Sequence, residues 1–386
     1  MNLISSVTSS FISRFKTQPN IVIAPGRINL IGEHVDYNEG FVLPAAIDKH
    51  MVFAITSSGN ERCNIYSQDL DEGVSFSINE LTPGEAWINY LMGVLDGFER
   101  RGLPIHGVDC VFGGNIPNGA GLSSSAALCC GFGFALNELY KCNQSRLELA
   151  KIGQYAEHEF AGLMCGIMDQ YACLFGQKDA ALLLDCRSLT HETISIDLKD
   201  HSILLIDTKV KHTLATSAYN DRRSACEEGV HVLQKENKSV YSLRDVTRPM
   251  LYNHKDILGE DVFLKCLFVV EEITRTQLAA AHLKNNELAT FGDLMYQTHW
   301  GLSQLYKVSC PESDLLVGLA EEDKMHVLGA RMMGGGFGGC TINIVVKDHL
   351  KTFQEKVVAQ YLATFKKEPD FYSVSLGDGV HALPSH

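Results

Sequence analysis

The segment that most restricts how this chain can fold is residues 26–40, with the sequence GRINLIGEHVDYNEG. Apolar runs flank it on both sides, at residues 21–24 and 41–44. Five ionisable side chains lie within thirteen consecutive residues of this segment: Arg27, Glu33, His34, Asp36 and Glu39. A core strand does not accommodate unpaired charges, and a plain surface loop is not normally flanked so closely by apolar strands. The pattern predicts the polar wall of a pocket for a small polar ligand. For any one of these residues, a salt-bridged turn is an equally good interpretation.

Length and charge limit the class of protein. The chain has 386 residues, more than one domain core usually holds, so we expect two domains, residues 1–205 and 206–386. The net charge of −13 argues against nucleic acid and anionic membranes as partners. It leaves room for a nucleotide, because backbone N–H groups and a metal ion can hold phosphate.

Targeting and redox signals are absent from the sequence pattern. Residues 1–16 do not resemble a signal peptide, and no apolar run reaches the roughly 18 residues of a membrane-spanning helix. The 12 cysteines contain no CxxC pair and no zinc spacing. We therefore expect a cytoplasmic protein, a monomer, with buried free thiols.

Hydrophobic periodicity predicts a strand-rich α+β first half and an α/β sandwich second half. Helices are expected over residues 2–16, 87–101, 123–140, from 145 to about 160, and over 263–284, 287–306 and 350–365. Strands are expected over residues 21–24, 42–47, 52–56, 63–67, 74–78, 108–112, 180–185, 202–207, 341–346 and 371–376.

A second polar segment is residues 117–127, PNGAGLSSSAA, at the start of a helix that is apolar nearly all round. It is not a Walker A loop, because the lysine is missing, and not a dinucleotide fingerprint, because serine replaces the last glycine. Glycines permit close backbone approach, and a helix N-terminus with serine hydroxyls suits phosphate. The alternative is a serine-capped helix after a glycine turn.

Three further features carry possible chemistry. Asp169 lies in an apolar, small-residue setting and could act as a general base or orient a hydroxyl; a helix N-cap or buried ion pair is the alternative. Glu157, twelve residues earlier, is most simply an exposed helical glutamate. Residues 332–340, MMGGGFGGC, predict a tight turn where backbones approach each other or a ligand, supporting the first glycine loop or closing over phosphates.

Taken in this order, the segments resemble the motifs of the GHMP small-molecule kinases, and residues 26–40 resemble the signature of the galactose-phosphorylating members. The resemblance extends to residues 165–170, 181–189 and 217–228. It implies a two-domain GHMP kinase fold, with a ribosomal protein S5 domain 2-like N-terminal domain and a ferredoxin-like C-terminal domain. The implied activity uses ATP and Mg²⁺ to phosphorylate the anomeric hydroxyl of galactose. The products would be galactose 1-phosphate and ADP, in the first committed step of galactose catabolism, the Leloir pathway.

The resemblance also implies roles for individual residues. Asp169 would be the catalytic base or orienting carboxylate, and Arg27 would stabilise the transition state and tune Asp169. Sugar binding would involve Glu33, His34, Val35, Asp36, Gly166 and Tyr219. ATP binding would involve Ser67, Gly119, Ala120, Gly121, Leu122, Ser123, Ser124 and Ser125. Mg²⁺ would be held by Ser125 and Glu157, which replaces the plainer interpretation of Glu157.

Three alternatives stay open at this point. The same chemistry could act on another sugar, such as N-acetylgalactosamine or a uronic acid, since the sequence does not size the pocket. A catalytically silent sugar and ATP sensor is disfavoured by the intact serine motif and Asp169. A nicotinamide oxidoreductase is disfavoured by the glycine spacing and the missing acidic ribose-binding position.

Overall fold

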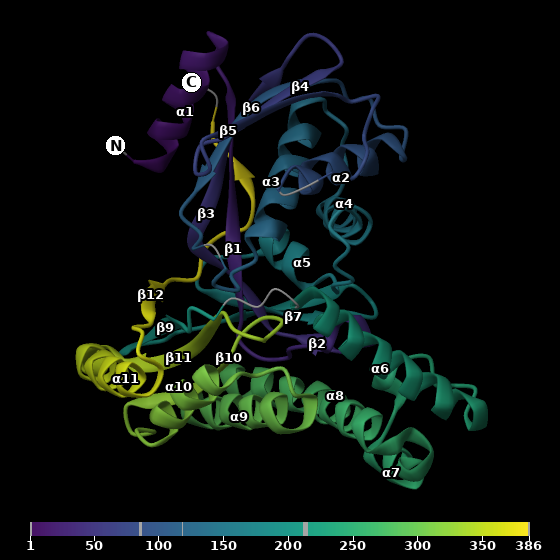
Figure 1. The fold of residues 1–386 in the computed structure, drawn as a ribbon, viewed down its shortest axis with the longest axis vertical. Coiled ribbons are helices and arrows are strands. Elements are labelled where there is room, and N and C mark those ends of the chain that lie inside the picture. Colours follow the sequence, from purple (N-terminus) through teal and green to yellow (C-terminus); the bar gives the residue numbers. More distant parts are fainter. Residues whose placement is uncertain (1, 85–86, 118, 211–214, 385–386) are drawn as a thin grey trace.

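The computed structural model describes residues 2–84, 87–117, 119–210 and 215–384, and these form two lobes built on separate sheets (Figure 1). Asn118, part of the predicted phosphate-binding segment, lies outside the described residues. In the part of the chain that is described, no helix is both long enough and apolar enough to cross a membrane. All 12 cysteines are free thiols, and only Cys165 is not fully buried, as expected.

The first lobe contains a six-stranded sheet in the order β13-β1-β3-β6-β4-β5. Only the β4–β6 pair is parallel among these strands. The strands are β1 (Asn20–Asn29), β3 (Pro44–Ser57), β4 (Arg62–Ser67), β5 (Glu72–Ser77), β6 (Val108–Gly114) and β13 (His381–Ala382). Because β13 pairs with β1, the end of the chain returns to the first lobe.

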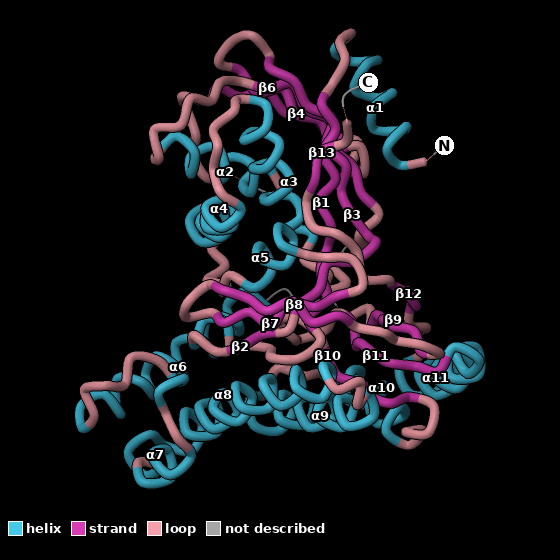
Figure 2. The backbone as a smooth tube through the Cα atoms, turned by 180° about the vertical axis from the view of Figure 1, so that it is seen from behind, coloured by secondary structure: helices cyan, strands magenta, loops and turns pink. Residues whose placement is uncertain are grey.

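Helices cover both faces of this sheet (Figure 2). On one face lies α1 (Leu3–Phe15), which buries Val7 and Phe11 against Val52 and Val111 of the sheet. Its N-terminus is capped because the Asn2 side chain accepts a hydrogen bond from the Ser5 amide at 2.8 Å. On the other face lie α2 (Ile88–Glu99), α3 (Ser124–Leu139), α4 (Arg146–Glu159) and α5 (Met168–Phe175).

Helix α3 sits unusually close to the strands. A Cβ atom on Gly131 would lie 2.3 Å from the Phe53 ring and 2.6 Å from the Ala24 side chain, so the helix can take this position only with glycine there. This close packing contributes to the burial of α3 nearly all round. The loop that leads into α3 lies beside the motif of residues 26–40, because the Arg27 amide donates to the Leu122 carbonyl at 3.2 Å.

The second lobe contains a four-stranded antiparallel sheet in the order β10-β11-β9-β12. Its strands are β9 (His201–Asp207), β10 (Val327–Met332), β11 (Cys340–Val346) and β12 (Asp370–Val374). This order, with α11 (Leu350–Phe365) between β11 and β12, is the ferredoxin-like arrangement that was expected. The remaining elements are α6 (Ala215–Glu236), α7 (Arg248–Asn253), α8 (Lys255–Lys284), α9 (Leu288–Gly301) and α10 (Pro311–Glu321).

A small third sheet joins the two lobes. It consists of β2 (Phe41–Val42), β7 (Ala180–Asp185) and β8 (Thr190–Ser195). It contacts β3 of the first lobe and α8 of the second (Figure 2). The charged segment that precedes β2 is therefore held at the junction of the lobes.

Several sequence expectations need correction. The strands expected over 42–47 and 52–56 are mainly one 14-residue strand, β3, because the polar residues Asp48–His50 lie at partly exposed positions within it. The helix expected over 263–284 begins at Lys255, with a non-helical Gly259, and the one over 287–306 ends in a π-helical turn, residues 302–306. The strand expected over 371–376 ends at Val374.

Candidate active site

A cavity of about 320 Å³ lies where the two lobes meet. Six segments form its wall: the motif of residues 26–40, the loop leading into α3, the end of α4, the start of α5, helix α6 and the glycine loop after β10. Its polar lining residues include Arg27, Glu33, His34, Asp36, Ser123, Ser124, Ser125, Glu157, Asp169 and Tyr219. The structure therefore brings together residues from both predicted polar segments and from four further parts of the chain.

Arg27 and Asp169 form a bidentate ion pair in the wall of this cavity. Arg27 lies at an irregularity of β1, and its Nε and Nη2 each donate to one oxygen of Asp169 at 2.7 Å. Its Nη1 donates to the Gly121 carbonyl at 2.6 Å, in the glycine loop. Burial alone lowers the pKa of Arg27, but the charge and hydrogen bonds of Asp169 raise it overall, so Arg27 stays cationic.

Asp169 is fixed from a third side as well. It lies in the first turn of α5, where the helix dipole favours a negative charge. The Ser123 hydroxyl also donates a hydrogen bond to Asp169 Oδ2. The carboxylate therefore has one orientation, with 24% of its side chain still exposed in the cavity.

The glycine loop aims a helix N-terminus into the cavity. Gly119 (φ +75°), Gly121 (φ +73°) and Ser123 (φ +56°) all occupy the left-handed region of backbone space. No side chain of the described residues caps the start of α3, so its first-turn N–H groups remain available as donors. With Ser124 and Ser125 beside them, these donors suit the oxygens of a phosphate group.

Glu33 is buried and tied to the second lobe. Its Oε1 accepts hydrogen bonds from Nη1 and Nη2 of Arg331, each at 3.1 Å, and from the Gly334 amide at 2.8 Å. Only 2% of the Glu33 side chain is exposed, yet it lines the cavity. Arg331 was not anticipated from the sequence.

His34 also contacts the second lobe. Burial lowers the pKa of His34 to about 3, so the ring is neutral. Its Nε2 lies 3.1 Å from the Gly335 carbonyl, which can only accept, so Nε2 carries the proton. Nδ1 therefore accepts from the Tyr37 hydroxyl at 2.7 Å, and the Tyr306 hydroxyl lies 2.7 Å from that of Tyr37. Both ring nitrogens are occupied by protein partners.

Asp36 has an acidic and crowded environment. Burial, together with the nearby charge of Asp169, raises the pKa of Asp36 to about 7. A Cβ atom on Gly166 would lie 2.0 Å from Asp36 Oδ2, so the carboxylate occupies space that only glycine leaves open. Tyr219 of α6 closes the same part of the cavity, and its ring lies 5.1 Å from that of His34.

Glu157 of α4 and Ser125 of α3 provide a further pair of oxygen atoms in the cavity wall. Ser125 Oγ donates to Glu157 Oε1 at 3.2 Å, and Gln170 Nε2 donates to the same oxygen at 3.0 Å. Burial, and then the charge of Asp169, raises the pKa of Glu157 to about 7. A buried carboxylate beside a hydroxyl, both lining the cavity, is a donor set that fits Mg²⁺.

The comparisons with known proteins agree with this geometry. Family models match for the GHMP kinases N terminal domain (residues 89–177), the galactokinase galactose-binding signature (residues 9–57) and the GHMP kinases C terminal region (residues 279–363). The galactokinase of Clostridium acetobutylicum is 40% identical over 99% of this chain and 100% of its own length. The chain belongs to the galactokinase family. The galactokinase of Thermotoga maritima is 39% identical, covering 94% of this chain and 99% of its own.

Solved structures give the same result for the fold. Lactococcus lactis galactokinase complexed with galactose matches with a TM-score of 0.95 and 32% identity, over 99% of this chain and 100% of that one. A mevalonate kinase matches with a TM-score of 0.62 and 20% identity, over 93% of this chain and 99% of that one, which supports the fold alone. The expected two-domain GHMP kinase fold is confirmed.

Three predicted site residues of this galactokinase-family chain lie outside the cavity lining. Ser67 is buried at the end of β4, Val35 is buried behind the wall formed by its neighbours, and Ala120 is buried within the glycine loop. Conversely, the predicted turn of residues 332–340 supplies lining residues, Gly334 to Phe337, and lies against the first glycine loop. Its packing on that loop is one of the two arrangements that the sequence suggested.

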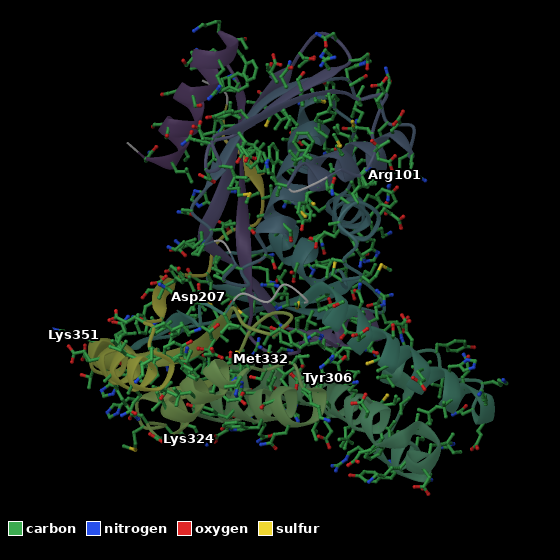
Figure 3. All side chains as sticks on the ribbon, in the orientation of Figure 1. Arg101, Asp207, Tyr306, Lys324, Met332 and Lys351 are labelled. Atoms are coloured by element: carbon green, nitrogen blue, oxygen red, sulfur yellow. The ribbon has the colours of Figure 1, made fainter. Side chains whose placement is uncertain are left out.

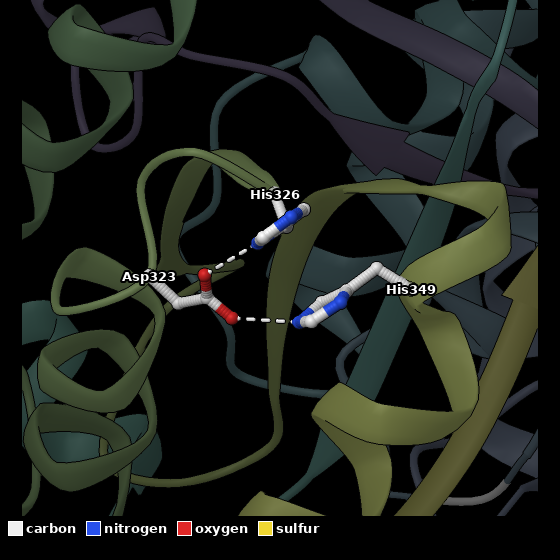
Figure 4. Close-up of side chains that lie close together, drawn as sticks. All are labelled: Asp323, His326 and His349. Atoms are coloured by element: carbon white, nitrogen blue, oxygen red, sulfur yellow. Dashed lines mark hydrogen bonds and ion pairs between the residues drawn. The ribbon is translucent and has the colours of Figure 1, made fainter.

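A second cluster of polar side chains, Asp323, His326 and His349, belongs to the second lobe and does not line the cavity (Figure 4). Asp323 accepts hydrogen bonds from His326 Nδ1 and His349 Nε2, each at 2.8 Å. The two imidazole rings stack with centroids 3.9 Å apart and planes 14° from parallel. A metal ion held by both rings must lie near both ring planes, which nearly parallel, separated planes do not allow. We therefore interpret the cluster as a hydrogen-bonded link between the ends of β10 and β11.

Proposed function

We propose that this chain transfers the γ-phosphoryl group of ATP to the anomeric hydroxyl of galactose, giving galactose 1-phosphate and ADP. The observation that carries the proposal is the Arg27–Asp169 pair, placed between a glycine loop suited to phosphate and an acidic wall suited to sugar hydroxyls. The names of the relatives and the galactose bound by the Lactococcus lactis enzyme support the choice of sugar.

The nucleotide would occupy the side of the cavity formed by α3. First-turn N–H groups and the hydroxyls of Ser123 and Ser124 would donate to phosphate oxygens. Ser125 and Glu157 would hold Mg²⁺, which when bound neutralises charge on the phosphate oxygens. Ser67, which does not line the cavity, remains a proposed contact to the nucleotide.

The sugar would lie against Glu33, Asp36, Gly166 and Tyr219, with its anomeric hydroxyl directed at Asp169. Phosphoryl transfer proceeds through a loose transition state, so the nucleophile needs orientation more than early deprotonation. Asp169 orients the hydroxyl and accepts its proton as the bond to phosphorus forms. Arg27 holds Asp169 and stabilises negative charge on the transferring group.

The direct test is ADP release from ATP and Mg²⁺ across a panel of galactose, N-acetylgalactosamine, galacturonic acid and glucose. We expect galactose to give the highest kcat/KM, and Asp169→Asn to remove the sugar-dependent rate. Strong turnover with another sugar would reassign the substrate. ATP and galactose binding without turnover would identify a sensor. Light scattering tests the accompanying proposal that the chain is a monomer.

A further inference from the structure

Arg331 is a fully buried arginine whose every nitrogen is committed. It belongs to β10 of the second lobe, next to Met332, whose position at the junction of the lobes Figure 3 shows. Its side chain is 0% exposed, and the residue is the largest among the fully buried side chains. An arginine in such a place needs partners for five N–H groups and for its charge.

The partners lie mainly in the opposite lobe. Nε donates to the Leu30 carbonyl at 2.8 Å, Nη2 donates to the Asn29 carbonyl, and Nη1 donates to the Met332 carbonyl at 2.6 Å. Both Nη atoms also donate to Glu33 Oε1. Arg331 therefore fixes the end of β1 and the carboxylate of Glu33 together, although 298 positions separate the two charged residues.

The two oxygens of Glu33 are used differently. Oε1 receives three hydrogen bonds, two from Arg331 and one from the Gly334 amide. None of the residues that the structure describes donates to Oε2, and Glu33 lines the cavity. A carboxylate held through one oxygen in this way has a defined position for the other.

We propose that Arg331 is a positioning residue for sugar recognition: it occupies Oε1 of Glu33 and thereby presents Oε2 as the acceptor for one sugar hydroxyl. The proposal rests on the proposed function, since it assigns Glu33 to the sugar. It makes the second lobe part of substrate selection, and it predicts that Arg331 acts on galactose binding only through Glu33.

The test uses Arg331→Lys, Glu33→Gln and the double variant Glu33→Gln/Arg331→Lys in steady-state assays. Lysine keeps the charge but lacks the planar fork that reaches Glu33 and the main-chain carbonyls together. We expect Arg331→Lys to raise the galactose KM about tenfold, a loss typical for one charged hydrogen bond, and to leave the ATP KM within twofold. The double variant should match Glu33→Gln alone, because Arg331 then has no carboxylate to position. Multiplying effects, or equal changes in both KM values, would overturn the proposal.

Two further measurements exclude a merely structural role. Monodeoxygalactoses identify the hydroxyl that Glu33 binds, as the one whose removal no longer matters in Glu33→Gln. Arg331→Lys should weaken discrimination at that hydroxyl and at no other. Arg146→Lys is the matched control: Arg146 also donates to two main-chain carbonyls but lies away from the cavity, so both KM values should stay unchanged.

A second double variant tests the proposal if Arg331→Lys is too unstable to assay. If Arg331→Lys does not fold, Glu33→Gln/Arg331→Met removes both buried charges and leaves neither unpaired. It should fold and share the galactose KM of Glu33→Gln, and a tenfold higher KM would contradict the proposal. If the wild-type chain shows no galactose-dependent turnover, the proposed function is wrong. Calorimetric titration of the wild type and of Arg331→Lys with galactose then tests the role of Arg331 separately.

Discussion

Asp36 is expected to destabilise the ligand-free protein, and Asp36→Asn should reveal this. In the folded chain the pKa of Asp36 is raised to about 7, chiefly by burial, whereas its ordinary value is 3.8. Above pH 7 Asp36 is ionised in both states. Ionisation costs more free energy in the folded protein than in the unfolded chain, so it destabilises the folded state. Asparagine keeps the size of the side chain and can still accept the 3.0 Å hydrogen bond from the Tyr37 amide.

The magnitude follows from the two pKa values. A rise from 3.8 to about 7 corresponds to about 4 kcal/mol, at about 1.4 kcal/mol for each pH unit. Asp36 lines an open cavity, so water screens part of this cost, and we expect Asp36→Asn to add about 2 kcal/mol at pH 8. For a chain of 386 residues this corresponds to a Tm about 2 °C higher.

The sign of the pH dependence is fixed by the direction of the shift. Between pH 4 and 7 the folded protein binds a proton at Asp36 that the unfolded chain does not, so wild-type stability increases as the pH falls. The advantage of Asp36→Asn should therefore be largest at pH 8 and diminish steadily toward pH 4. Thermal unfolding without ligands, at pH 8 and pH 5.5, measures both quantities.

The same substitution should impair sugar binding. Loss of a charged acceptor is worth roughly 1.5–3 kcal/mol, so the galactose KM should rise about 10- to 100-fold while the ATP KM changes little. Asp293→Asn, at an exposed position on α9, is the control and should change neither stability nor KM. A lower Tm at pH 8 together with an unchanged galactose KM would refute the reasoning.

Three other substitutions test separate parts of the site. Asp169→Asn should lower kcat about 100- to 10,000-fold while ATP binding, measured by titration, survives; a kcat within tenfold of wild type would remove Asp169 from the mechanism. Glu157→Gln should raise the Mg²⁺ concentration for half-maximal rate at least about tenfold, and an unchanged requirement would exclude Glu157 as a ligand. Gly166→Ala should displace Asp36 and raise the galactose KM about tenfold, whereas Gly318→Ala, with no neighbour within 4 Å, should not; equal KM values would contradict the steric argument.

The sequence predicted well those elements whose burial follows a simple period. Helix α11 has the predicted limits, residues 350–365, because its apolar residues recur at helical spacing toward one sheet. Strand β10 was missed. It contains Gly329, where a Cβ atom would lie 2.5 Å from the Gly292 Cα of α9. Glycine lowers strand propensity, and the close approach of a helix that makes it necessary is visible only in three dimensions.

For the candidate site too, the sequence predicted which segments are polar but not which of their residues are in contact. Charged and glycine-rich segments indicated where polar chemistry would lie, because such residues are costly beside apolar strands unless they are paired. The neighbouring sequence does not predict which residues pair with these charges. Arg27 and Asp169 are 142 positions apart, and their pairing was suggested by family resemblance. Arg331 gave one signal that could have been used, a single arginine between apolar neighbours at the end of a short strand.

The side chains that line the cavity carry a net negative charge, so a bound nucleotide needs positive groups to compensate for it. Among the described lining residues, Glu33, Asp36, Glu157 and Asp169 are carboxylates, and Arg27 is the one permanent cation. A polyanionic nucleotide would be repelled by such a wall in the absence of compensation. Uncapped N–H groups at α3 supply part of it without adding a side-chain charge. A divalent cation held by Glu157, as proposed above, would supply the rest, and it would also favour the ionised form of a carboxylate whose pKa burial has raised to about 7. With the N–H groups of α3 and such a cation together, the proposed sugar site and the proposed phosphate site would share one cavity without excluding the nucleotide.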